Sequence, residues 1–292
     1  MPKAPAYIYE KLTWSQINEA VVAGKVPIIP VGSIEQHGPH LPLDVDCVLP
    51  RGVAMHAAEQ IPDQVLILPT LVVGYTAHVM DFPGTLNLHY SHFIDMIIDV
   101  GKSLAYHGFK KMIFLNGHGS NMPNLDLAVR RINLETDAEA AFCAWWRLLT
   151  VDKDFPPNWR ESAFPGGCNH ACELETSAYL YLDPEHVRQE LAENSLPRYI
   201  EEGSEFLWFD LFGDGPVHMN TWTSSYTKTG AFGSSALGTA EKGEAAVKEA
   251  ARQLARFVAE FAKRPKDGRV DHHAVRPTFE MPWGQGPAPS EG

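Results

Sequence analysis

The sequence predicts an α/β fold in which a mainly parallel sheet carries helices on both faces. Short apolar runs alternate along the chain with longer segments of helical periodicity, and this alternation is typical of βαβ units. The densest polar motifs follow two of the apolar runs directly, at the place where parallel sheets hold their binding sites. The chain has 292 residues, of which 45% are hydrophobic, so it is long enough to bury a continuous core. We expect a single domain.

Four short apolar runs are predicted as strands. Their length, and the prolines that interrupt two of them, are typical of buried strands rather than of helices. The predicted strands are Val26–Val31, Val65–Val73, Lys111–Leu115 and Ala140–Trp146.

Five segments have apolar residues at helical spacing, which places those residues on one helical face. Val53, Ala57 and Ile61, for example, follow one another at intervals of four. The predicted helices are Val48–Ile61, His92–His107, Met122–Leu134, Glu173–Leu182 and Ala240–Lys263.

Two segments break the alternation. Glu201–Tyr226 is rich in Gly, Trp, Phe and His without a clean period, and we interpret it as a lid or an oligomer contact. Residues 265–292 contain several prolines, so we expect an extended arm with a disordered tip. The folded domain is therefore predicted to span residues 1–264.

The charge argues against two classes of partner. The chain has 24 Lys and Arg against 36 Asp and Glu, a net charge of −12, which repels nucleic acid phosphates and anionic lipids. No stretch reaches the roughly 18–20 apolar residues that span a bilayer, and the N-terminus lacks the apolar core of a signal peptide. The four cysteines form no zinc-ribbon pattern, so we expect free thiols in a cytoplasmic protein without nucleic acid or membrane partners.

Potential metal ligands cluster after the first and third predicted strands. Glu35 and His37 are two residues apart, so on an extended segment both side chains point to one side, and Asp44 and Asp46 repeat that relation. His118 lies between two glycines, which would let the backbone approach a ligand closely. Such a donor set suits zinc, manganese or iron, and Asp46 could bridge two ions. The simpler alternative is that these groups hydrogen-bond to loop backbone.

Six motifs in order resemble those of the creatininase (creatinine amidohydrolase) family and span roughly residues 10–262. They are Val31–Gly38, Leu43–Asp46, Phe82–Thr85, Leu115–Gly119 with Asn121, His170 with Glu175–Ser177, and Gly238–Gly243. The resemblance implies a three-layer α/β/α fold, one or two divalent ions (Zn²⁺, Mn²⁺ or Fe²⁺), and a homo-oligomer, with hexamers occurring in the family.

The resemblance also implies residue roles. One metal would be held by Glu35, Asp46 and His118, and the second by His37, Asp46 and Glu175. His170 would be the catalytic residue that moves protons at the leaving group. His78 and Phe82–Thr85 are candidates for shaping the pocket.

Departures from the family pattern argue against creatinine as the substrate. Gly119 and Ser120 stand where creatinine hydrolases have Tyr-Glu, and Gly166 replaces one of two tryptophans, although Trp146 matches the other. We therefore expect a metal-activated water to attack the carbonyl of another small amide, cyclic amide or formamide. One alternative is a hydrolase that opens a keto-inositol of the 3-dehydro-scyllo-inosose type at a carbon–carbon bond. A second is a non-catalytic metal-binding protein.

Overall fold

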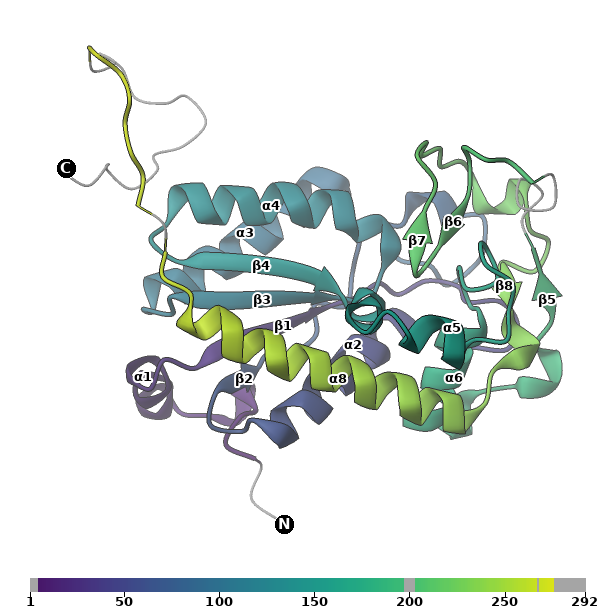
Figure 1. Cartoon of the computed structure of the whole chain (residues 1–292), viewed down its shortest axis with the longest axis horizontal. Coiled ribbons are helices and arrows are strands. Elements are labelled where there is room, and N and C mark those ends of the chain that lie inside the picture. Colours follow the sequence, from purple (N-terminus) through teal and green to yellow (C-terminus); the bar gives the residue numbers. More distant parts are fainter. Residues whose placement is uncertain (1–4, 197–202, 267, 276–292) are drawn as a thin grey trace.

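A four-stranded parallel sheet in the order β2-β1-β3-β4 forms the centre of the computed structural model, which describes residues 5–196, 203–266 and 268–275 (Figure 1). Its strands are β1 (Val26–Val31), β2 (Val65–Ile67), β3 (Lys111–Asn116) and β4 (Glu139–Ala144). In the register, Ile28 pairs with Ile67 on one side and with Ile113 on the other. The predicted parallel sheet is confirmed.

Alternating side chains of the strands enter two separate cores. Ile28 and Ile113 pack into a core closed by α2 (Val45–Gln60), α6 (Glu173–Leu182) and α8 (Ala240–Lys263). Ile29 and Phe114 point to the opposite face and pack with α1 (Trp14–Val22), α3 (Tyr90–Tyr106) and α4 (Met122–Glu135). The result is the expected three-layer α/β/α arrangement, and Figure 1 shows α3 and α4 on one side of the sheet with α2 and α8 on the other.

Two predicted strands are too long. Pairing in β2 stops at Ile67 because Pro69 follows, and beyond it only Leu71 forms an isolated bridge to Val31. The run Ala140–Trp146 leaves the sheet at Ala144, where a 3₁₀ helix, Trp145–Val151, begins. Helices α1 and α5 (Phe155–Trp159) were not predicted.

Between α6 and α8, the described residues form only short elements. β5 (Asn194–Ser195) pairs with β8 (Gly233–Ser234), and β6 (Phe209–Asp210) forms a hairpin with β7 (Gly213–Asp214). The irregular segment predicted at Glu201–Tyr226 therefore includes this hairpin, although its first two residues lie outside the described part. Residues 276–292 also lie outside the described part, so the predicted disordered tip is untested. All four cysteines are free, and none of the helices described is long and apolar enough to cross a membrane.

Candidate metal centre

The predicted ligands converge where the strand order reverses. β1 and β3 are neighbours, but the chain visits β2 between them, and such switch points are where open parallel sheets bind ligands. Glu35 and His37 lie in the loop after β1, and His118 lies in the turn after β3. Asp46 is in the first turn of α2 and Glu175 in the first turn of α6.

Two glycines bring Asp46 into this position. A Cβ atom on Gly117 would lie 2.0 Å from the backbone oxygen of Asp46, and one on Gly32 would lie 2.7 Å from it. The first turn of α2 therefore packs directly on the ends of β1 and β3. Gly117 is therefore needed for this helix contact, and not for the close approach to a ligand that the sequence suggested. A Cβ atom on Gly119 would meet nothing within 4 Å.

Three sets of three described residues could each hold a metal ion, with ligand atoms within 4.8 Å of one another in each set. One set is Glu35 with His37 and His170. The other two share Asp46: Glu35 with Asp46 and His118, and His37 with Asp46 and Glu175. His118 Nδ1 is 3.2 Å from Glu35 Oε2 and 3.1 Å from Asp46 Oδ2. His37 Nε2 is 3.2 Å from Asp46 Oδ1 and 4.0 Å from Glu175 Oε1. The two oxygens of Asp46 thus face different histidines, as bridging two ions would require.

Backbone carbonyls fix the orientation of both histidines. His37 Nδ1 is 3.2 Å from the Glu35 oxygen, and His118 Nε2 is 3.1 Å from the Tyr75 oxygen. A carbonyl oxygen can only accept, so each of these nitrogens must donate its N–H. In the neutral imidazole the other ring nitrogen of each histidine then carries the lone pair and points into the cluster, as expected of a metal-binding imidazole.

Several buried atoms of the cluster have no hydrogen-bond partner within the described residues. They include Glu35 Oε1, His37 Nε2 and Asp46 Oδ2, and their residues are at most 2% exposed. Buried polar atoms are seldom left without a partner, so convergent unpaired donors of this kind fit a divalent cation. The chemistry of the set, carboxylates and imidazoles, suits zinc, manganese or iron.

The cluster raises the pKa values of three of its members, His37, His118 and Glu175. Burial alone would lower the pKa of His37, but the Asp46 and Glu175 carboxylates outweigh it and raise that pKa to about 9. Burial raises the pKa of Glu175 to about 7, with Asp46 adding to the effect and His37 opposing it. Positive charge is therefore favourable here, whether protons or a metal ion supply it.

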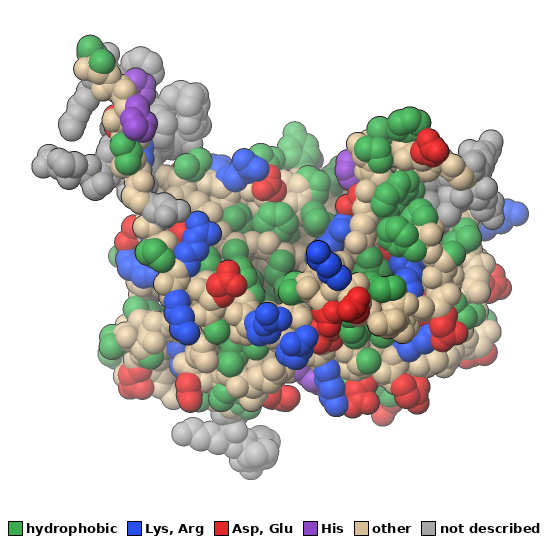
Figure 2. Space-filling model, viewed as in Figure 1, with side chains coloured by type: hydrophobic (Ala, Val, Ile, Leu, Met, Phe, Trp, Pro, Cys, Tyr) green, Lys and Arg blue, Asp and Glu red, His purple; other side chains and the backbone are tan. Residues whose placement is uncertain are grey.

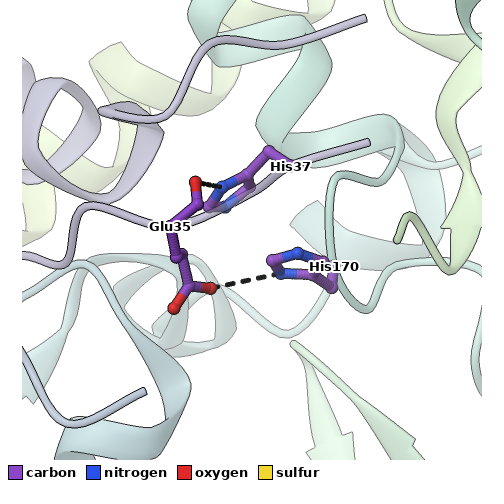
Figure 3. Close-up of side chains that lie close together, drawn as sticks. All are labelled: Glu35, His37 and His170. Atoms are coloured by element: carbon purple, nitrogen blue, oxygen red, sulfur yellow. Dashed lines mark hydrogen bonds and ion pairs between the residues drawn. The ribbon is translucent and has the colours of Figure 1, made fainter. Parts of the chain in front are cut away.

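His170 lies beside this cluster, with its ring tilted by 36° to that of His37 and the ring centroids 4.3 Å apart (Figure 3). Its Nε2 lies 2.9 Å from the carbonyl oxygen of Gln36 and 3.1 Å from the side-chain nitrogen of Gln36, and its Nδ1 faces Glu35 Oε1 at 3.7 Å. Burial, followed by the nearby positive charge on His37, lowers the pKa of His170 to about 3. The imidazole is therefore neutral.

Two residues that were not predicted from the sequence orient the carboxylates of Glu35 and Glu175. The Thr76 hydroxyl donates to Glu35 Oε2, and the backbone N–H of Ala171 donates to Glu175 Oε2 at 2.5 Å. Ala171 has a φ of 52°, a left-handed conformation that non-glycine residues seldom adopt outside functional sites. Thr76 lies in a stretch without periodicity, so no sequence signal indicated it.

Two other residues singled out in the sequence have different roles. Asp44 is not part of the cluster, because its Oδ1 accepts a hydrogen bond from the Tyr179 hydroxyl at 2.8 Å. Thr85 accepts from the backbone N–H of Gln36 at 3.3 Å, and none of Phe82–Thr85 lines the cavity described next.

A cavity of about 770 Å³ opens from the cluster. Its floor includes Glu35, Asp46, His118, His170 and Glu175. Its walls include His78, Ser120, Trp146 and many residues between Leu207 and Tyr226. His78 thus shapes the pocket as predicted, and part of the irregular segment covers it.

Comparison with known proteins identifies the family. A family model described as creatininase, creatinine amidohydrolase, matches residues 10–258. The chain belongs to the creatininase family. It is 30% identical over 189 residues to the creatinine amidohydrolase of Pseudomonas putida, covering 61% of this chain and 72% of that protein. It is 27% identical over 284 residues to the 3-dehydro-scyllo-inosose hydrolase of Thermotoga maritima, covering 92% and 88%.

Solved structures of creatininase have the same fold. One crystal structure superposes with a TM-score of 0.73 at 25% identity, covering 89% of this chain and 99% of that one. Creatininase structures with manganese and with two zinc ions are among the similar ones. The predictions of the fold, the family and a hydrolase are therefore confirmed. The substrate, the identity of the metal and the roles of individual residues stay predictions.

Proposed function

We propose that this creatininase-family member hydrolyses an amide of a small molecule at a centre of one or two divalent ions, with a substrate other than creatinine. The observation that carries the proposal is the pair of ligand sets that share Asp46 at the floor of the cavity. Glu35, His37, Asp46, His118 and Glu175 would hold the metal.

The metal, when bound, would polarise the amide carbonyl and lower the pKa of a water molecule near it toward about 7. His170 supplies proton transfer. It would take a proton from the attacking water at Nδ1, beside Glu35, and return it to the departing nitrogen. The contacts of Nε2 with Gln36 hold the ring in this orientation.

The test is metal content with a matched pair of variants. Purified protein should contain about one to two equivalents of zinc, manganese or iron by mass spectrometry. Asp46→Asn should lose metal, whereas Asp44→Asn, two residues away but outside the cluster, should keep it. Glu35→Gln and His118→Ala should lose it as well. A metal-free protein that ignores added metal and all four changes would refute the proposal.

A second candidate function is the opening of a keto-inositol ring at a carbon–carbon bond. One observation favours it: the alignment with the inosose hydrolase covers 92% of the chain and so necessarily spans the segment that covers the cavity. Metal-loaded protein should be assayed in parallel with cyclic amides, formamides and 3-dehydro-scyllo-inosose. Turnover of the inosose alone would select this candidate over the amide hydrolase.

Three predictions from the sequence await their own measurements. We propose a homo-oligomer, a cytoplasmic location, and a folded domain that ends near residue 264. Light scattering, fractionation and limited proteolysis, respectively, would test them.

A further inference from the structure

The cavity above the metal centre is far larger than an amide group and a small ring require. Its volume of about 770 Å³ lies within the range of pockets that enclose drug-sized ligands. Four of the five predicted metal ligands, Glu35, Asp46, His118 and Glu175, line its floor together with His170, and residues between Leu207 and Tyr226 form a large part of its wall. A substrate that fills this space must extend beyond the group that is cleaved.

The wall formed by that segment exposes large apolar side chains. Trp222 is 52% exposed and Met219 is 69% exposed, and both line the cavity together with Val217 and Trp208. Figure 2 shows hydrophobic side chains gathered around the hairpin of β6 and β7. Apolar groups exposed to a cavity are costly in water, and this cost is removed when an apolar ligand covers them.

The charged groups on this wall compensate one another. Arg147 and Asp214 both line the cavity and form an ion pair with each other, joining the 3₁₀ helix after β4 to β7. An anionic or cationic substrate group would have to compete with this pair. One oxygen of Asp214 has no donor among the residues described, so it can accept a hydrogen bond from a neutral N–H or O–H. His218, Asn220 and Thr221 of the same segment also line the cavity, so the wall suits an uncharged ligand group that offers apolar surface to Trp208, Val217, Met219 and Trp222.

We propose that the substrate is an amide that carries an uncharged aromatic or branched aliphatic arm. The amide lies over the metal centre, and the arm packs against Trp222, Met219 and Val217. This inference rests on the proposed amide hydrolase function and specifies its substrate class. Hydroxyl groups placed against these three side chains would lose hydrogen bonds to water, so the arm itself carries none there.

Hydroxamates test the arm without requiring turnover. They place the same two oxygen ligands on a metal ion whatever group they carry, so a difference in affinity reports the arm alone. The full-length protein is loaded with zinc and titrated by calorimetry with acetohydroxamate and with 3-phenylpropionohydroxamate. The phenyl compound should bind about tenfold more tightly or better, as expected for burial of an aromatic ring.

Two tryptophan variants locate the effect. Trp222→Ala should reduce the advantage of the phenyl compound to about threefold or less and leave the affinity for acetohydroxamate unchanged. Trp14→Ala is the matched control, because Trp14 is 80% exposed on α1 and does not line the cavity, and it should preserve the full difference.

The possible outcomes separate this inference from the function on which it depends. Equal affinities for the two hydroxamates in zinc-loaded protein would overturn the arm and leave the metal centre intact. A phenyl preference that survives Trp222→Ala would overturn the placement of the arm on this wall. A protein that takes up no zinc and binds neither compound would overturn the proposed function and the inference together.

Discussion

Thr76→Val tests whether the surroundings of the cluster control its metal affinity. Thr76 is fully buried, and its hydroxyl donates to Glu35 Oε2 while the second oxygen, Oε1, has no partner among the described residues. The hydroxyl thus fixes the carboxylate plane, with Oε2 directed toward His118 and Oε1 toward His170. Valine has nearly the same shape, so the change removes the hydrogen bond with little effect on packing.

The magnitude follows from the loss of one hydrogen bond to a charged acceptor. Such a bond contributes about 1.5–3 kcal/mol, which corresponds to roughly 10- to 150-fold in an equilibrium constant. Loss of an outer partner of a metal ligand typically weakens binding about 10- to 100-fold. We therefore expect the zinc dissociation constant of Thr76→Val, measured by competition with a chelator, to rise by about one to two orders of magnitude.

Two control variants make the reasoning refutable. Thr76→Ser keeps the hydroxyl and should retain an affinity within about threefold of the parent protein. Thr70→Val makes the same chemical change at a buried hydroxyl that has no hydrogen-bond partner within the described residues, so it should leave zinc affinity unchanged. If Thr76→Val binds zinc as tightly as Thr76→Ser does, the hydroxyl does not position Glu35 for a metal.

Three further predictions follow from other parts of the structure. Without metal, His37 has a pKa of about 9 and Glu175 a pKa of about 7, so both bind protons at lower pH. Metal binding must displace these protons. The metal affinity, measured by competition with a chelator, should therefore rise as the pH increases from about 7 to about 9. Gly117→Ala should abolish metal binding or folding, since its Cβ would lie 2.0 Å from the Asp46 oxygen, whereas Gly119→Ala should preserve both when assayed by zinc content and circular dichroism. Hydrogen bonds from Arg131 and Lys102 lower the pKa of Glu135, so the ionised carboxylate stabilises the fold at pH values above its unfolded pKa of 4.5. Glu135→Gln should therefore reduce the free energy of unfolding in urea by about 1 kcal/mol near neutral pH. The reduction should become smaller as the pH falls below about 4.

The central sheet could be predicted because its strands are buried on both faces. A strand such as β1, with every residue buried, must be apolar throughout, so it stands out from helices whose apolar residues recur at intervals of three or four. The end of β2 was misplaced because apolar composition continues past Pro69 although pairing does not. Helix α1 was missed because only Ala20 of its nine residues is buried, although Thr13 and Gln16 form a capping box that signals its start.

The candidate site residues could be predicted where residue spacing and the order of the motifs indicate them. Glu35 and His37 share a side because their loop is extended, as assumed. Asp44 and Asp46 have the same spacing, but α2 begins at Val45, and residues two apart across a helix start diverge. Only Asp46 therefore enters the cluster. The contribution of Thr76 depends on tertiary contacts between distant segments, which no local pattern in the sequence records.

Charge balance explains why such a cluster is compatible with a stable fold. Three buried carboxylates, Glu35, Asp46 and Glu175, face two histidines, and an uncompensated buried charge of this kind is strongly destabilising. Without metal, protons on His37 and His118 offset part of it, which is why the pKa values of both histidines are raised. One divalent ion carries the same charge as those two protons, a second ion adds more, and either also provides a partner for the unpaired atoms. The buried carboxylates thus destabilise the fold without metal and stabilise it when metal is bound. Metal content and the free energy of unfolding should therefore vary together across variants of the five proposed metal ligands.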